Sequence, residues 1–118
     1  MDSNLNNFVF LSHNTTGWNS DKPEFLFSLA NVINAKIIAV QEHMLLRDNL
    51  HKLGDKFTNF EAFSIPAVKS NENISRGRPS GGLSLLWRSE LNSYISRISG
   101  VKSDRVQAVT LKLNNILT

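Results

Sequence analysis

Two polar residues each follow a strand-like run in the first half of the chain. Asn14 comes directly after residues 7–13, which begin with alternation and contain strong β-formers, and Glu42 follows KIIAVQ at 36–41, a β-branched run typical of a strand covered on both faces. If the two strands are parallel, their carboxyl ends lie at the same edge of the sheet, where α/β proteins bind ligands. An amide and a carboxylate presented there form a candidate metal and phosphate site.

Pattern alone leaves plainer interpretations open. Asn after a strand is common in turns, and Glu in that place is commonly a solvated charge or a cap. His13 and His43 flank the pair, but adjacent side chains on a strand point to opposite faces, so neither need join the site. We expect both histidines to lie on the surface or to be partly packed, and their spacing matches no helical zinc motif.

A helix is predicted between the two strands. The sequence DKPE at 21–24 offers a cap acceptor, a proline in the first turn and a glutamate three residues after the cap. The apolar series of this amphipathic helix is Phe25, Leu29, Val32 and Ile33. Strand, helix and strand make a βαβ unit, whose right-handed crossover sets the two strands parallel.

The remainder is predicted to be one short helix and a series of strands. Leu46, Leu50 and Leu53 have helical spacing, and Gly54 stands where a left-handed C-terminal residue belongs. The polar segment 67–82 is predicted to be a long functional loop. The predicted strands of this region are 57–65, 83–87, 94–99 and 105–113. The expected fold class is therefore α/β, with a βαβ start followed by antiparallel strands.

Composition excludes several classes of protein. The chain has 118 residues, 41% hydrophobic and 19% charged, the make-up of a single globular domain. It contains no cysteine, which excludes a disulfide scaffold, a Cys-ligated metal site and a thiolate nucleophile, and favours a nuclear or cytoplasmic location. No signal or transit peptide is recognised. The longest apolar run, Ile37–Val40, is far below the roughly 20 residues that span a bilayer, so no membrane partner is expected.

The net charge of +3 is concentrated in one segment. Residues 69–88 hold four basic side chains and one glutamate, which accounts for the whole excess. Arg78 is the candidate contact to a DNA phosphate, and Arg76 and Lys69 would extend the patch; a solvated loop is the plain alternative. The glycines of this segment are expected to serve the backbone through positive φ or close approach: Gly77, Gly81 and Gly82.

Several segments, in this order, resemble the endonuclease domain of non-LTR retrotransposons, a branch of the DNase I-like endonuclease/exonuclease/phosphatase superfamily. They are SHNTTGWNS at 12–20, IIAVQEHML at 37–45, GRPSGGLSLLWR at 77–88 and SDRVQAVTLKL at 103–113. The resemblance implies a partial DNase I-like α/β sandwich and Mg²⁺-dependent hydrolysis of DNA phosphodiesters. It also implies catalytic roles for Asn14 and Glu42, with Glu42 as the metal ligand, and a substrate contact for Arg78.

The second half of the chain departs from that family. The family activates water with an aspartate and a histidine near the end of the domain, and it also has a Gly-Asp-x-Asn turn and a tyrosine. Here no Asp follows Asp104, no His follows His51, and Tyr94 is the single tyrosine. The last predicted strand runs almost to Thr118, so we expect residues 1–118 to be a truncated N-terminal half of the domain, inactive alone. A phosphoesterase of the same fold acting on inositol phosphates or sphingolipid, a decayed or domesticated remnant binding DNA or a partner, and a gene-model fragment remain as alternatives.

Overall fold

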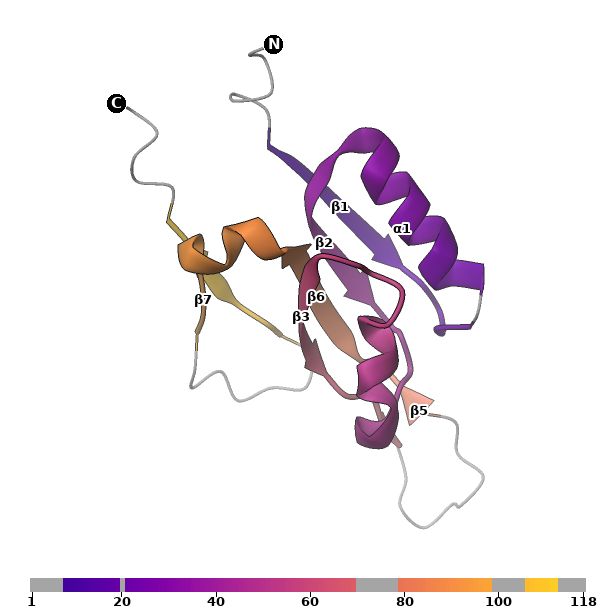
Figure 1. The fold of residues 1–118 in the computed structure, drawn as a ribbon. Helices are drawn as coiled ribbons and strands as arrows, with labels where there is room; N and C mark the ends of the chain where they lie inside the picture. Colours follow the sequence, from indigo (N-terminus) through magenta and orange to yellow (C-terminus); the bar gives the residue numbers. More distant parts are fainter. Residues whose placement is uncertain (1–7, 20, 70–78, 99–105, 113–118) are drawn as a thin grey trace, which may run out of the picture.

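The computed structural model describes residues 8–19, 21–69, 79–98 and 106–112. At its centre is a four-stranded sheet with the strand order β1-β2-β6-β3 (Figure 1). The bounds of these strands are Val9–Asn14 for β1, Ala35–Gln41 for β2, Phe60–Ile65 for β3 and Leu83–Arg88 for β6. β2 and β6 are therefore the central strands, and Glu42 leaves the sheet from one of them.

The predicted βαβ unit opens the fold. β1 and β2 are parallel, with Asn14 opposite Gln41, and α1 (Asp21–Ile33) connects them. β6 pairs antiparallel with β2 on one side and with β3 on the other. The expected class, a mixed α/β fold with a βαβ start followed by antiparallel strands, is confirmed.

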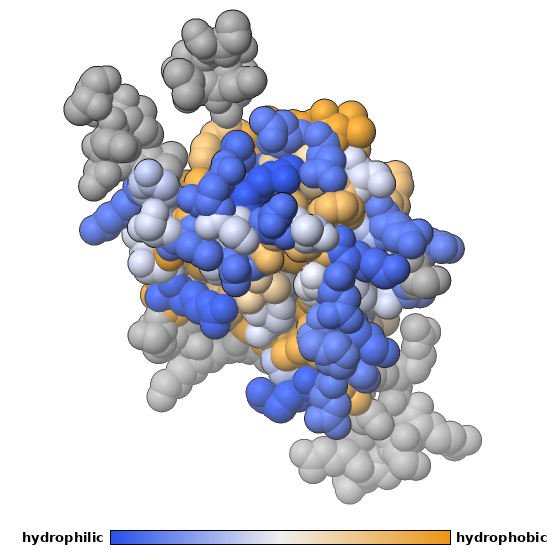
Figure 2. All heavy atoms as spheres, viewed as in Figure 1, coloured by the Kyte–Doolittle hydropathy of each residue, from blue (hydrophilic) through white to orange (hydrophobic). Residues whose placement is uncertain are grey.

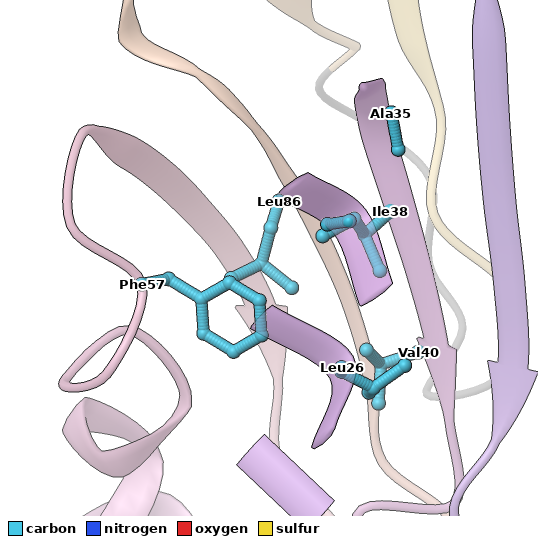
Figure 3. Close-up of a cluster of buried hydrophobic side chains, with 7 residues drawn as sticks. Leu26, Ala35, Ile38, Val40, Phe57 and Leu86 are labelled. Carbon is cyan, nitrogen blue, oxygen red and sulfur yellow. The ribbon is translucent and has the colours of Figure 1, made fainter. Parts of the chain in front are cut away.

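A buried cluster fixes α1 on one face of this sheet. Phe57 lies at its edge, with its ring edge-on to the rings of Phe27 and Phe60 at 5.5 and 5.6 Å between centroids. Burial of apolar surface is the dominant favourable term in folding, so this cluster holds the helix against the strands that carry Asn14 and Glu42. The members of the cluster, shown in Figure 3, are Leu26, Ala30, Ala35, Ile38, Val40, Phe57 and Leu86.

The opposite face is covered in part by the 3-10 helix η3 (Ser89–Tyr94) and by the hairpin of β7 (Ile95–Arg97) and β8 (Val109–Leu111). Its buried cluster is Ile37, Trp87, Leu91 and Ile95. The Trp87 Nε1 donates to the Asn92 Oδ1 at 2.7 Å, which satisfies the indole in this partly apolar setting. Both faces of β2 meet apolar side chains, which agrees with the unbroken apolar run Ile37–Val40 in the middle of the strand.

The helix α1 was predicted correctly, but its buried face was not. The buried residues are Pro23, Leu26 and Ala30, whereas Phe25 is 59% and Val32 81% exposed. The helix carries apolar side chains on more than one side, and the small Ala30 lets its backbone approach the sheet closely. Figure 2 accordingly shows hydrophobic surface at the upper edge of a largely hydrophilic face, over the end of α1 that leads into β2.

Other local predictions also need correction. The predicted second helix is the 3-10 helix η2 (Arg47–Leu53), and Gly54 has a φ of −99°, so its left-handed assignment was wrong. The ends of the predicted loop 67–82 form two-residue strands, β4 (Val68–Lys69) and β5 (Pro79–Ser80), which pair with each other. Within the described ranges, the strands predicted at 94–99 and 105–113 shorten to β7 and β8. In that same part of the chain, no helix is long and apolar enough to cross a membrane.

Candidate functional site

A pocket of about 500 Å³ opens where β1 and β2 end. Polar residues and apolar residues both contribute to its wall. A concave, mostly apolar site with a few polar groups is the usual form of a small-molecule site. The residues that line it are Asn14, Gln41, Glu42, Met44, Pro66, Val68, Ser80, Gly81, Gly82 and Leu83. Both residues singled out from the sequence, Asn14 and Glu42, are thus brought together here.

Asn14 is the last residue of β1 and takes part in a turn as well as in the pocket. Its Oδ1 accepts hydrogen bonds from the backbone N and from the Oγ1 of Thr16, both at 3.1 Å. A backbone N–H can only donate, so the oxygen of the carboxamide must be the atom that faces the turn. The Nδ2 group is then the part of Asn14 that remains to donate to a ligand.

Glu42 turns the chain immediately after β2. Its φ is 58°, in the left-handed region, which costs a residue with a side chain roughly 1–2 kcal/mol. Its N–H donates to the Gly82 oxygen at 2.8 Å, and its carbonyl accepts from the Gly17 N at 2.7 Å and from the Thr15 Oγ1 at 3.2 Å. A strained residue persists where its surroundings over-determine it, and such residues cluster at functional sites.

The loop after β1 is tied to the same turn. Thr15 is buried, and its Oγ1 also contacts the Gln41 carbonyl at 3.1 Å. The Lys22 Nζ, from the first turn of α1, donates to the carbonyl oxygens of Thr15 and Thr16. The beginning of the helix, the end of β1 and the end of β2 are therefore linked through polar contacts next to the pocket, most of them partly buried.

His43 is the residue of this region that the sequence pattern missed. Its side chain is 0% exposed, so the prediction of a surface or partly packed histidine was wrong for it. β2 ends at Gln41 and the chain turns at Glu42, so the burial of His43 does not follow from strand geometry; as expected, His43 does not line the pocket. His13 remains on β1 with an intermediate exposure, as expected.

The hydrogen bonds of His43 fix its tautomer. Its Nδ1 accepts from the Leu45 backbone N at 2.9 Å, and its Nε2 lies 3.0 Å from the Ile65 carbonyl oxygen. A backbone N–H only donates and a carbonyl only accepts, so the ring is neutral and carries its proton on Nε2. Burial lowers the pKa of this imidazole, although its contacts with the backbone of Ile65 and Leu83 act in the opposite direction.

Gly81 and Gly82 lead into β6 with φ values of 82° and 96°. A Cβ added at Gly82 would lie 2.4 Å from the His43 Cε1, so the imidazole occupies the space beside this glycine. At Gly81 a Cβ would meet nothing within 4 Å. The predicted positive φ is confirmed for both glycines. The close approach to another group is found at Gly82 and not at Gly81.

The predicted phosphate contacts remain predictions. Arg78, Arg76 and Gly77 lie outside the described residues, and the side chain of Lys69 is also outside them. Arg88, which contributes to the same basic excess, serves the fold instead. Its Nε donates to the Ala35 carbonyl at 2.9 Å, and its guanidinium lies 4.5 Å from the centroid of the Phe60 ring.

The pocket offers a small number of oxygen donors to a metal. Glu42 supplies a carboxylate, and the Gln41 Nε2 donates to the Ser12 Oγ at 3.1 Å, which leaves the Gln41 Oε1 as an acceptor. No group of three or more His, Cys, Asp or Glu side chains that could hold a metal occurs within the described ranges. Mg²⁺ is usually held by one or two carboxylates, retained waters and substrate phosphate, so a pocket with one carboxylate is compatible with it.

Comparison with known proteins gives a likeness of fold. No protein-family model matches the chain, and no curated protein matches it. Among solved structures, the crystal structure of humanized D. rerio TDP2 with 14 mutations is similar, with a TM-score of 0.49 and 15% identity over 89% of this chain and 42% of that one. The chain spans less than half of that structure, and a likeness at this level concerns the path of the backbone alone.

Proposed function

We propose that this chain is the metal-holding N-terminal half of a Mg²⁺-dependent DNA phosphodiesterase domain of the kind found in non-LTR retrotransposons. The observation that carries the proposal is the shared pocket of Asn14 and Glu42, which come from the ends of two parallel strands. The motifs that resemble the retrotransposon endonucleases include both residues, and this supports the same assignment.

Each polar group has a distinct role in the proposal. Glu42 holds Mg²⁺, with water and phosphate oxygens as the remaining ligands. The metal, when bound, polarises a phosphoryl oxygen and stabilises the charge that develops on it. Asn14 donates from Nδ2 to a phosphate oxygen, because its Oδ1 is already engaged by Thr16. If Arg78 reaches the same phosphodiester backbone, it adds affinity that does not depend on sequence.

The apolar part of the pocket supports a nucleotide as ligand. Its volume of about 500 Å³ lies within the range of roughly 300–1,000 Å³ that is usual for sites of organic ligands. Met44, Pro66, Val68 and Leu83 provide the apolar wall. A phosphate bound at Glu42 and Asn14 would leave this wall to the sugar or base attached to it.

In this proposal the chain binds Mg²⁺ and a nucleotide but does not hydrolyse a phosphodiester. Among the described residues that line the pocket, Glu42 is the single ionisable side chain. A carboxylate that holds the metal does not at the same time serve as a well-placed general base, and hydrolysis requires the base, the phosphate clamp and the nucleophile to be assembled together. We therefore expect Mg²⁺ and nucleotide binding, but no hydrolysis by this chain alone.

Titration calorimetry with Mn²⁺ as a probe for the Mg²⁺ site tests the proposal. The native chain should bind Mn²⁺ in competition with Mg²⁺, and Glu42→Gln should weaken binding at least ~10-fold, because it removes the charged ligand. Glu61→Gln, which changes an exposed carboxylate on β3 outside the pocket, is the matched control and should leave binding unchanged. Equal binding by native chain and Glu42→Gln would refute the metal role.

Nicking of supercoiled plasmid with Mg²⁺ tests the expected lack of turnover. Native chain and Glu42→Gln should both stay at the background rate. Nicking by the native chain that Glu42→Gln abolishes would instead show that the residues present here suffice for hydrolysis.

A further inference from the structure

His43 joins several backbone segments around the pocket but does not line it. Its Nδ1 accepts from the Leu45 N, its Nε2 donates to the Ile65 carbonyl at the end of β3, and its ring lies against Gly82. The residue directly before it in the chain is Glu42. No role in metal or phosphate binding is available to its ring nitrogens, because both already have backbone partners.

The backbone around the ring forms a compact set of hydrogen bonds. The Gly82 oxygen accepts from the N–H groups of Glu42 at 2.8 Å and of His43 at 3.4 Å. The Met44 N–H donates to the Gly81 oxygen at 2.9 Å. The double-glycine segment and the turn at Glu42 are thus held face to face, and the imidazole fills the space between them.

A neutral imidazole suits this place because it combines three properties. It offers one acceptor and one donor on opposite sides, and it is thin enough to lie beside a glycine Cα. Leucine in this place would leave the Leu45 N–H and the Ile65 carbonyl without their side-chain partner, and buried backbone groups are rarely left so. Asparagine can replace the acceptor for the Leu45 N–H, which lies near its own backbone. The longer glutamine can extend a donor toward the Ile65 carbonyl.

We infer that His43 is a positioning residue for Glu42. It holds the Glu42 backbone in its left-handed conformation and thereby sets the direction in which the carboxylate enters the pocket. The consequence for metal binding rests on the proposed function, whereas the conformation of Glu42 does not depend on it. Outer partners of metal ligands commonly act in this way, and their loss typically weakens metal binding 10- to 100-fold.

Nuclear magnetic resonance of the metal-free chain tests the geometry directly. Long-range proton–nitrogen spectra should show a neutral His43 with its proton on Nε2, and the coupling constant and carbon shifts of Glu42 should show a positive φ. His43→Leu should abolish the positive φ of Glu42. Ser84→Ala removes another buried hydrogen-bonding side chain of the same sheet, bonded to the Ser64 Oγ at 2.8 Å, and should not change Glu42.

Milder variants keep the test decisive if His43→Leu does not fold. His43→Asn retains an acceptor for the Leu45 N–H and should restore the Glu42 conformation in part, whereas His43→Gln should restore less, because its polar group reaches past that N–H. A positive φ at Glu42 in every folded His43 variant would overturn the inference. A proton on Nδ1 in the native chain would overturn it as well.

Mn²⁺ titration of the same variants tests the consequence for metal binding. The folded His43 variants should bind Mn²⁺ about 10-fold more weakly than the native chain, with His43→Asn the least affected, while Ser84→Ala should bind normally. Native affinity in His43→Asn and His43→Gln alike would refute the positioning role. If the native chain itself binds no Mn²⁺, the proposed function fails, and the resonance measurements still decide whether His43 sets the turn.

Discussion

A methyl group added at Gly82 should destabilise the protein far more than one added at Gly81. Both glycines have positive φ, so alanine at either place should cost roughly 1–2 kcal/mol of backbone strain. At Gly82 the new Cβ would also lie 2.4–2.8 Å from atoms of the His43 ring, which is buried and bonded on two sides. A ring displaced far enough to clear the new methyl group leaves both of its backbone partners, and each lost hydrogen bond costs about 1 kcal/mol.

The expected destabilisation is therefore about 3–4 kcal/mol for Gly82→Ala and about 1–2 kcal/mol for Gly81→Ala. Urea unfolding followed by circular dichroism measures both, and the difference of about 2 kcal/mol should also lower the Tm by roughly 8 °C or more relative to Gly81→Ala. Equal destabilisation of the two variants, within about 0.5 kcal/mol, would refute the contact between Gly82 and His43.

A double variant isolates that contact. In a His43→Ala background the imidazole is absent, so adding Gly82→Ala should cost only the backbone strain and match the cost of Gly81→Ala. The resulting coupling between residues 43 and 82 should be of the order of 1–3 kcal/mol, as is usual for residues in contact. A coupling near zero would mean that the ring moves aside without losing its partners, and the packing account of the double glycine would be wrong.

The remaining predictions concern pH and the helix. Because burial lowers the pKa of His43 in the folded protein, its neutral form contributes stability that is fully present above the unfolded value of about 6.5 and is lost as the pH falls toward the folded value. Thermal melts between about pH 8 and pH 5 should show a larger loss of Tm for the native chain than for His43→Asn, and parallel losses would contradict this. Leu26→Ala should cost about 2–5 kcal/mol and Val32→Ala less than about 0.5 kcal/mol, because only Leu26 is buried; similar costs in urea unfolding would contradict the observed helix face.

The βαβ start and the shared position of Asn14 and Glu42 could be predicted because local signals agreed with the global fold. The β-branched run ending at Gln41 and the turn cluster at Asn14 mark two strand ends, and the handedness of the crossover places them at one edge. The helix face could not be predicted, since Phe25 and Leu26 are both apolar and only the packing against the sheet decides between them. The two short strands at the ends of the predicted loop 67–82 could not be recognised, because a strand of two residues is too short to show a periodic pattern.

The role of His43 could not be read from the sequence for a different reason. Its partners, Ile65 and Gly82, are distant in the chain and lie beside it only when β6 pairs with β2 and β3 pairs with β6. The chain also turns at Glu42, so strand geometry does not determine where the side chain of His43 lies. The double glycine was the available signal, because Gly82 requires both positive φ and space beside it, but the sequence did not show which side chain fills that space.

The groups that hold Glu42 are separate from the groups that hydrolysis requires. The turn is fixed by Thr15, Gly17, His43 and Gly82, all of them described parts of this chain, and their contacts to it are hydrogen bonds and packing within the fold. The orientation of the Glu42 carboxylate therefore does not depend on the presence of a general base, a second acidic residue or a substrate. Under the proposed function, metal affinity and turnover should therefore respond to different substitutions, because cleavage of a phosphodiester requires further groups to be assembled beside the metal.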